Sequence, residues 1–352
     1  MKSRRKNNRS RNKIRVAILG VGNVASILMQ ALQAKRLDGV WHERLGNRSI
    51  SDIEIVAAFD IDRNKVGNDL SDAIFAPPNV SPKLSEVRPT GIIVKPGLSG
   101  SDVPPHLADV AIGGRSVVDE LKSSGTEIVL NLIPSGMQES SLRYCREAVS
   151  AGCDFINATP AKIASDPRIS RRFEESKLLV VGDDLMSQFG GTAFHKGILE
   201  FINNRGLKVN KSYQLDVGGG SETLNTITEE VKLTKRNIKS EAIAVEIPYK
   251  FQTVAGTTDY VDYMGNDRTS YFWISAKSFM GSETKVDIYL RTNDSTNAAN
   301  VIFDVMRAVR YSREKLHVFG SPKEICGYGF KNLREPTVLR ASAEQFLKKY
   351  NF

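Results

Sequence analysis

The sequence predicts an α/β protein in which a doubly wound parallel sheet is followed by a second α+β domain with an open β-sheet. Short apolar runs typical of buried strands alternate with helical patterns up to about residue 184, as in a parallel sheet covered on both faces. From about residue 197 the strand patterns become longer and alternate between apolar and polar residues. That alternation indicates a sheet with one face open to water or to a partner.

The first elements are a buried strand, a glycine turn and a helix, within VAILGVGNVASILMQAL from Val16 to Leu32. Their core is Gly20-x-Gly22-x-x-Ala25, the pattern of a dinucleotide-binding turn. The first glycine permits the tight turn and the second lets a pyrophosphate approach the backbone. The phosphates would then lie at the helix N-terminus, whose unpaired N–H groups attract anions.

The second strand, IEIVAAFDID from Ile53 to Asp62, follows a polar insert at residues 34–51 and places Asp60 near its end. A carboxylate at this position accepts hydrogen bonds from the adenosine ribose and repels a 2′-phosphate. These two patterns together predict a Rossmann-type domain that binds NAD in preference to NADP.

Further strands and helices complete the predicted parallel sheet. Strands are expected at Thr126–Pro134, Cys153–Pro160 and Lys177–Asp184, with helices at Glu139–Ser150 and Asp166–Ser176. Ligands of such sheets bind beyond the carboxyl ends of the strands. The candidate cofactor-binding residues at these ends are Gly20, Gly22, Asn23, Val24, Asp60, Pro134, Ser135, Thr159, Asp183 and Asp184. The adjacent carboxylates Asp183 and Asp184 would border the nicotinamide end, although a helix N-cap pair is an alternative.

Strand patterns dominate the second domain. They lie at Tyr213–Gly220, Ala242–Phe251, Thr269–Phe279 and Thr284–Asp294, and a helical pattern at 297–315 returns toward the first domain. We therefore expect a basic tail at residues 1–14, an NAD-binding Rossmann domain at 15–196 and a catalytic and oligomerisation domain at 197–305. Residues 306–352 would form a C-terminal segment that returns to the Rossmann domain.

The net charge of +9 is concentrated at the N-terminus, where residues 1–15 contain eight Lys and Arg and no acid. A solvated, disordered tail is the favoured interpretation, because no stacking aromatic residues accompany these charges; contact with nucleic acid or an anionic surface is the alternative. No run approaches the roughly 18 apolar residues of a membrane span. The three cysteines lack C-x-x-C spacing, so reduced thiols, no structural zinc and a cytoplasmic location are expected.

Several blocks together give the sequence a family resemblance: GVGNVASIL, AAFDIDRNKVGNDLSDAIF, FINATPAKIASDP, VVGDDLMSQFGGT, LDVGGG, NDSTNAANVIFDVMRAV and GYGFKN. In this order they resemble the myo-inositol-1-phosphate synthases, particularly their short archaeal and actinobacterial branch. The resemblance covers about residues 15–335. Composition and spacing alone would indicate only a Rossmann-type NAD protein.

The resemblance implies an isomerase that uses NAD as a recycled catalyst and glucose 6-phosphate, or a similar sugar phosphate, as substrate. The sugar would be oxidised at C5, enolised toward C6, cyclised by attack of C6 on the C1 aldehyde and reduced to 1L-myo-inositol 1-phosphate. This is the first step of inositol and inositol-phospholipid biosynthesis. Cations are needed at the phosphate and at the enolate oxygen. The family meets this need with lysines, in some members helped by a divalent or monovalent metal ion, and a homotetramer is implied.

The catalytic residues implied by the resemblance are Lys331, Lys196, Asp294 and Lys239, the last with Arg236 as an alternative register. The chain departs from the family pattern at Met186 and Thr269, where lysines are expected, and at Gly220, where the family has asparagine. Lys162 is a candidate to replace the cation missing at Met186, or else caps a helix or faces water. His195 is expected to be structural.

Two other functions remain open at the level of sequence. One is an NAD-dependent oxidoreductase or isomerase of another sugar phosphate, with its site altered around Met186 and Thr269. The other is a non-catalytic NAD-binding protein that has kept the fold. The inositol-phosphate synthase is the leading hypothesis.

Overall fold

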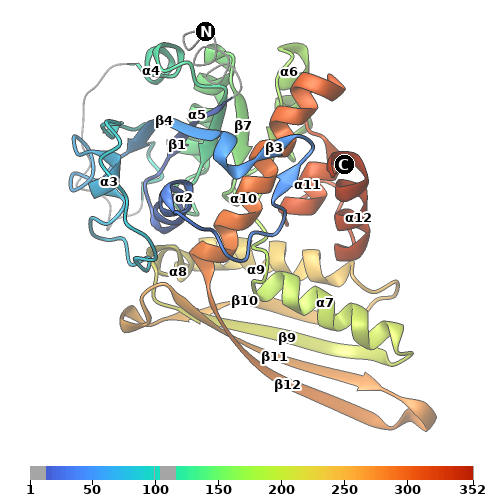
Figure 1. The fold of residues 1–352 in the computed structure, drawn as a ribbon. Helices are drawn as coiled ribbons and strands as arrows, with labels where there is room; N and C mark the ends of the chain where they lie inside the picture. The colour runs from blue at the N-terminus through green and yellow to red at the C-terminus, as the bar shows by residue number, and fades with distance from the viewer. Residues whose placement is uncertain (1–12, 99, 104–115, 352) are drawn as a thin grey trace.

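The computed structural model describes residues 13–98, 100–103 and 116–351 and contains two main sheets (Figure 1). The basic segment 1–12, which includes most of the predicted tail, lies outside the described residues. Among the described helices, none is long and apolar enough to cross a membrane.

The first sheet has six parallel strands in the order β5-β4-β1-β6-β7-β8. Its strands are β1 (Ile14–Leu19), β4 (Ile53–Asp60), β5 (Lys95–Pro96), β6 (Ile128–Asn131), β7 (Asp154–Asn157) and β8 (Val180–Val181). A separate hairpin of β2 (Arg44–Leu45) and β3 (Arg48–Ser49) occupies the polar insert. The central strands are buried on both faces, which explains their continuous apolar runs.

Helices cover both faces of this sheet, which confirms the predicted doubly wound fold. One face of β1, with Val16 and Ile18, packs with α2 (Asn23–Gln33), α10 (Asp294–Tyr311), α11 (Lys323–Gly329) and α12 (Leu339–Tyr350). The other face, with Ala17 and Leu19, packs with α4 (Val117–Ser123), α5 (Gln138–Ala151) and α6 (Pro167–Glu175). The short helix α3 (Leu70–Ala73) lies beyond β4.

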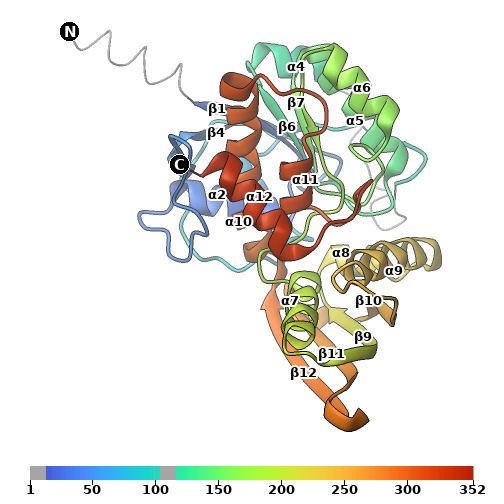
Figure 2. The same cartoon turned by 90° about the vertical axis from the view of Figure 1, so that its right-hand side faces the viewer.

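The second sheet has four strands in the order β10-β9-β11-β12. These are β9 (Lys208–Gly218), β10 (Gln252–Tyr260), β11 (Asp267–Lys277) and β12 (Glu283–Asn293), with α8 (Ser221–Thr226) after β9. The helices α7 (Gly191–Asn204) and α9 (Glu229–Ala244) pack on its inner face, between this sheet and the first domain (Figures 1 and 2). No described helix covers the outer face.

Two expectations from the sequence differ from the structure. The segment 242–251 was expected to be a strand, but α9 continues to Ala244 and β10 begins only at Gln252. The buried residues Ile238, Ala242 and Ile243 follow helical spacing, so the start of this stretch forms the last turn of α9 and not a strand. The expected boundary at residue 305 is also late, because α10 starts at Asp294 and packs in the core with α2. We propose a second domain at about residues 191–293.

Candidate active site

A cavity of about 270 Å³ lies where the carboxyl ends of the first sheet meet the inner face of the second sheet. Its walls come from the glycine turn after β1, the loops after β4, β6, β7 and β8, and the start of α7. From the second domain, β9, α8, α9 and β11 contribute side chains. This is the position at which open α/β sheets bind their ligands.

The glycine turn has the geometry that a dinucleotide requires. Gly20 has a φ of +86°, and a Cβ there would lie 2.9 Å from the carbonyl oxygen of Leu132, so a side chain does not fit. Gly22 is the N-cap of α2 and a Cβ on it would meet open space. Gly22, Asn23 and Val24 all line the cavity, so the N-terminus of α2 is free to receive a pyrophosphate.

Asp60 lies at the end of β4 and lines the same cavity. Its carboxylate accepts the backbone N–H of Val21 at 2.6 Å and those of Ile61 and Asp62 at 2.8 and 2.9 Å. These bonds hold the carboxylate beside the glycine turn, as an NAD ribose requires. Lys65, which the sequence analysis did not identify, lies with its Nζ 4.0 Å from Asp60 and 3.0 Å from Asn79 Oδ1. The predicted cofactor residues Pro134, Ser135 and Thr159 also line the cavity.

The adjacent carboxylates after β8 have different surroundings. Asp183 is fully buried, away from the cavity lining, and accepts hydrogen bonds from the backbone of residues 163–165 and from Asn157 and Ser165. It is therefore a structural residue, and the prediction that it borders the cofactor is corrected. Asp184 does line the cavity, has a φ of +59°, and keeps Oδ2 without a hydrogen-bond partner among the described residues.

Besides Lys65, four cations line the cavity, and each of the four is paired with one carboxylate. Lys331 Nζ lies 3.1 Å from Asp184, Lys239 Nζ 2.5 Å from Asp216, Lys235 Nζ 2.5 Å from Glu222 and Arg268 Nη2 2.9 Å from Asp294. All eight residues line the cavity. The two members of each pair have opposite formal charges. The four cations are therefore held in the partly buried site without adding a large net charge to it.

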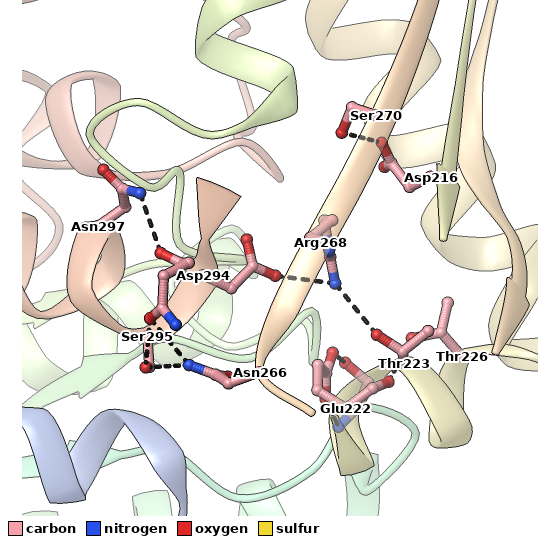
Figure 3. A network of polar contacts seen from close by, with 12 residues as sticks. Asp216, Glu222, Thr223, Thr226, Asn266, Arg268, Ser270, Asp294, Ser295 and Asn297 are labelled. Carbon is pink, nitrogen blue, oxygen red and sulfur yellow. Dashed lines mark hydrogen bonds and ion pairs between the residues drawn. The ribbon is translucent and has the colours of Figure 1, made fainter. Parts of the chain in front are cut away.

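The pairs come from separate elements. Lys235 and Lys239 are one turn apart on α9, so both point to the same side of that helix. Arg268 on β11 bridges Asp294, at the start of α10, and the hydroxyl of Thr223 on α8 (Figure 3). The site therefore joins both domains.

The buried charges shift the pKa values of the pairs. Burial lowers the pKa of Lys331, and the nearby positive charges of Lys239 and Lys235 lower it further. The carboxylate of Asp184 acts in the opposite direction and does not cancel this decrease. Burial alone would raise the pKa of Asp216, but Lys239 and Arg268 hold it well below its usual value. Asp216 also accepts hydrogen bonds from Ser270 at 2.6 Å (Figure 3) and from Gln214 at 2.8 Å. Asp216 is thus held as an anion, whereas burial favours the neutral form of Lys331.

Two of the predicted catalytic lysines lie elsewhere. Lys162 is exposed and is not part of the cavity lining, so it cannot replace a cation there. Lys196 is buried outside the lining, with its Nζ 3.2 Å from Glu246 and 2.7 Å from the carbonyl oxygen of Thr337. These two assignments are corrected. Lys331, Lys239 and Asp294 do lie in the cavity.

The departures from the family pattern also have a structural explanation. Thr269 pairs with Val217 on the outer face of the second sheet, because side chains alternate along a strand, whereas the neighbouring Arg268 lines the cavity. Met186 is 7% exposed, forms part of the cavity wall, and donates its backbone N–H to Gly329 at 2.8 Å. The cation next to the position of Thr269 is therefore Arg268, which lies in the cavity lining.

The sequence analysis missed Lys235, Arg268, Asp216 and Glu222. The spacing of Lys235 and Lys239 on an amphipathic helix was the signal that could have identified the first of these. The described part of the chain contains no ligand set for a metal ion, because no group of three or more His, Cys, Asp or Glu side chains converges there.

Comparisons with known proteins complete this description. The model of the myo-inositol-1-phosphate synthase family matches residues 190–295. The inositol-3-phosphate synthase of Mycobacterium tuberculosis is 32% identical over 351 residues, which are 95% of each chain. That of Corynebacterium glutamicum is 32% identical over 325 residues, 87% of this chain and 90% of the other.

Solved structures share the fold over most of the chain. The crystal structure of Ari2 has a TM-score of 0.75 at 29% identity and covers 96% of this chain and 99% of its own. The inositol-3-phosphate synthase of Caenorhabditis elegans shares the fold, with a TM-score of 0.74 at 15% identity, over 96% of this chain and 85% of its own.

Proposed function

The chain belongs to the myo-inositol-1-phosphate synthase family, and we propose that its cavity converts glucose 6-phosphate into an inositol phosphate with NAD as a recycled redox group. The enzyme is thus an inositol-3-phosphate synthase. The observation that carries the proposal is the convergence of four paired cations on the cavity that the glycine turn borders. A dehydrogenase needs no such number of cations, whereas enolisation and aldol closure on a phosphorylated sugar develop negative charge at several oxygens.

The first domain supplies the cofactor site. We assign the pyrophosphate to the N-terminus of α2 and the adenosine ribose to Asp60, whose position is fixed by the N–H of Val21. NAD bound there would supply hydride acceptance and hydride return to the sugar, so that the overall reaction would have no net redox change. The chain contributes the orientation of the cofactor and a partly buried cavity that limits contact with water.

The substrate phosphate is best accommodated at the N-terminus of α7. Gly190 is the N-cap, the first turn contains no acid, and residues 190–193 line the cavity. A Cβ on Gly191 would lie 2.2 Å from Gln214 Nε2 and 3.0 Å from Ser270 Oγ, and both of these groups donate to Asp216. Because Asp216 pairs with Lys239, an anion at this helix end would lie close to a lysine as well as to backbone N–H groups.

The remaining pairs suit the proton transfers and the enolate. Lys331, with its lowered pKa, pairs with Oδ1 of Asp184, while Oδ2 of the same carboxylate has no partner among the described residues, so this pair can receive and return a proton from a sugar hydroxyl. Lys235 and Arg268 are available to stabilise developing oxyanions. Met186 would then line the site as an apolar wall.

We also propose a homo-oligomer that is formed through the outer face of the second sheet. Tyr213, Leu215, Tyr271, Trp273, Tyr289 and Val254 lie on this face, and Tyr289 is 73% exposed. Tyr213 stacks on Trp273 with ring centroids 5.4 Å apart. A contiguous aromatic surface of this kind is typical of a protein interface. A tetramer is the state that the family resemblance implies.

The direct test is incubation of the purified protein with NAD and glucose 6-phosphate. We expect inositol phosphate in large excess over NAD, without accumulation of NADH. Accumulation of NADH with this or another sugar phosphate would point instead to an oxidoreductase, and NAD binding without any turnover to a non-catalytic protein.

A further inference from the structure

Asn225, in the last turn of α8, is a buried amide whose side chain has no hydrogen bond to any described residue. It is 4% exposed and lines the cavity. Neither its Oδ1 nor its Nδ2 has a partner among the residues that the structure describes. Leaving a buried donor and a buried acceptor unpaired is costly for the folded protein. Such an arrangement is expected where a ligand supplies the missing partners.

The surroundings of Asn225 indicate which part of the cavity it faces. Glu222, one helical turn earlier on α8, also lines the cavity and accepts the backbone N–H of Ser135 at 3.2 Å. Ser135 belongs to the loop after β6, and β6 lies on the opposite side of β1 from β4. A dinucleotide with its adenosine ribose at Asp60 and its pyrophosphate at α2 therefore extends its nicotinamide half toward the loop of Ser135.

The chemistry of the two unpaired atoms narrows the ligand group. An acceptor and a donor on one carboxamide require a partner that offers both. A phosphate at neutral pH offers mainly acceptors, and an ammonium offers only donors. The other unpaired atoms of the cavity differ in this respect: Asp184 Oδ2 accepts only and Arg268 Nε donates only.

We propose that Asn225 binds the carboxamide of the nicotinamide ring and fixes the orientation of that ring in the cavity. A ring held through its amide cannot rotate freely, so one face is presented to the sugar at both the oxidation and the reduction. The assignment rests on the proposed NAD-dependent function, but it concerns binding and can be tested without turnover.

The test compares NAD with ADP-ribose, which lacks the nicotinamide ring, by isothermal titration calorimetry. For Asn225→Leu we expect the Kd for NAD to rise by about tenfold or more, the scale of one lost hydrogen bond, and the Kd for ADP-ribose to stay the same. Ser81→Ala is the matched control: Ser81 Oγ is also buried and unpartnered but lies outside the cavity lining, so both affinities should stay unchanged.

A second readout separates a binding role from a structural one. Because the amide has no hydrogen-bond partner among the described residues, Asn225→Leu should leave the melting temperature unchanged or raise it, while the rise in melting temperature caused by NAD becomes smaller. If the leucine of Asn225→Leu disturbs the fold, Asn225→Ala serves in its place and should show the same selective loss of NAD affinity.

Three results would overturn the proposal. They are equal weakening of NAD and ADP-ribose, unchanged NAD affinity, and a higher KM for glucose 6-phosphate with unchanged NAD affinity, which would assign the amide to a sugar hydroxyl. Failure of the synthase function is separate, since it would appear as absent turnover in a wild-type protein that still binds NAD.

Discussion

At the scale of single residues, each cation of the cavity is held by its own carboxylate. Removing one member of such a pair leaves the other buried and unpaired, which costs more than the loss of a surface charge. Lys235 illustrates this, because its partner Glu222 also accepts hydrogen bonds from Ser135 in the first domain. The side chain of Lys162, by contrast, is exposed.

We predict that Lys235→Met lowers kcat/KM for glucose 6-phosphate by a factor of about 10² to 10³, the scale of one lost oxyanion donor. Lys162→Met, the matched control, should retain wild-type activity. Formation of inositol phosphate by both variants, with melting curves to verify folding, provides the measurement. A folded Lys235→Met enzyme with full activity would contradict the site, and a strong loss in Lys162→Met would contradict the placement of that lysine.

Single residues also show where sequence reasoning ends. Asp60 lines the cavity at the end of a strand beside the glycine turn, and its contact with the ribose stays a prediction. Arg268 was missed because a shift of one residue along a strand moves a side chain to the opposite face, and the sequence could not choose between Arg268 and Thr269. Lys162 was chosen as a cation that could replace the one missing at Met186, but the sequence does not fix the direction of its side chain.

At the scale of elements, the main error concerned α9. The apolar residues near its end suggested a strand, although Lys235, Ile238, Lys239, Ala242 and Ile243 are buried at helical spacing. Tertiary packing of this face against the second sheet decides the outcome. The same helical spacing brings Lys235 and Lys239 into the cavity. Because the helix was not recognised over its full length, this spacing was overlooked and Lys235 was missed.

The packing of α7 on β9 gives a pH prediction through His195. The side chain of His195 is buried. Its Nε2 lies 3.1 Å from Ser212 Oγ, and its Nδ1 lies 3.3 Å from Gln214 Oε1. Burial lowers the pKa of His195 from 6.5 to about 4. Between these two pH values His195 of the unfolded chain takes up a proton, whereas His195 of the folded protein does not. The contribution of neutral His195 to stability is therefore complete above pH 6.5 and is lost toward pH 4.

We expect the free energy of unfolding of the wild type to fall relative to that of His195→Asn by roughly 1.4 kcal/mol per pH unit below about pH 6.5. Burial raises the pKa of Asp154 to about 6, which gives the opposite slope, but both proteins contain Asp154 and its effect cancels in the difference. Urea unfolding of both proteins at pH 7 and pH 5 measures this quantity. An identical difference at the two pH values would contradict a neutral buried His195.

At the scale of the whole molecule, alternating strand and helix patterns were sufficient to predict the doubly wound sheet and the open sheet after it. How the two domains enclose the cavity could not be predicted, because contacts between them, such as those of Glu222 with Ser135 and of Arg268 with Asp294, join segments that are separated in the sequence. The direction in which each β11 side chain points follows from the pairing of that strand with β9.

The uncovered outer face of the second sheet predicts assembly. Tyr289→Asp should shift the protein toward smaller species in light scattering at micromolar concentration, because a charge would be buried in the interface. Phe279→Asp, at an 87% exposed position between β11 and β12, is the control and should leave the molar mass unchanged. A wild-type protein with the mass of a single chain would contradict the proposed oligomer.

The central claim, that one cavity both oxidises and reduces the same sugar, is tested most directly with glucose 6-phosphate deuterated at C5 and NAD at a concentration near that of the enzyme. The account predicts that inositol phosphate forms over many turnovers and retains the deuterium, since the hydride removed in the first half of the reaction is returned in the second. Loss of the deuterium to free, accumulating NADH, or an absence of inositol phosphate, would contradict it.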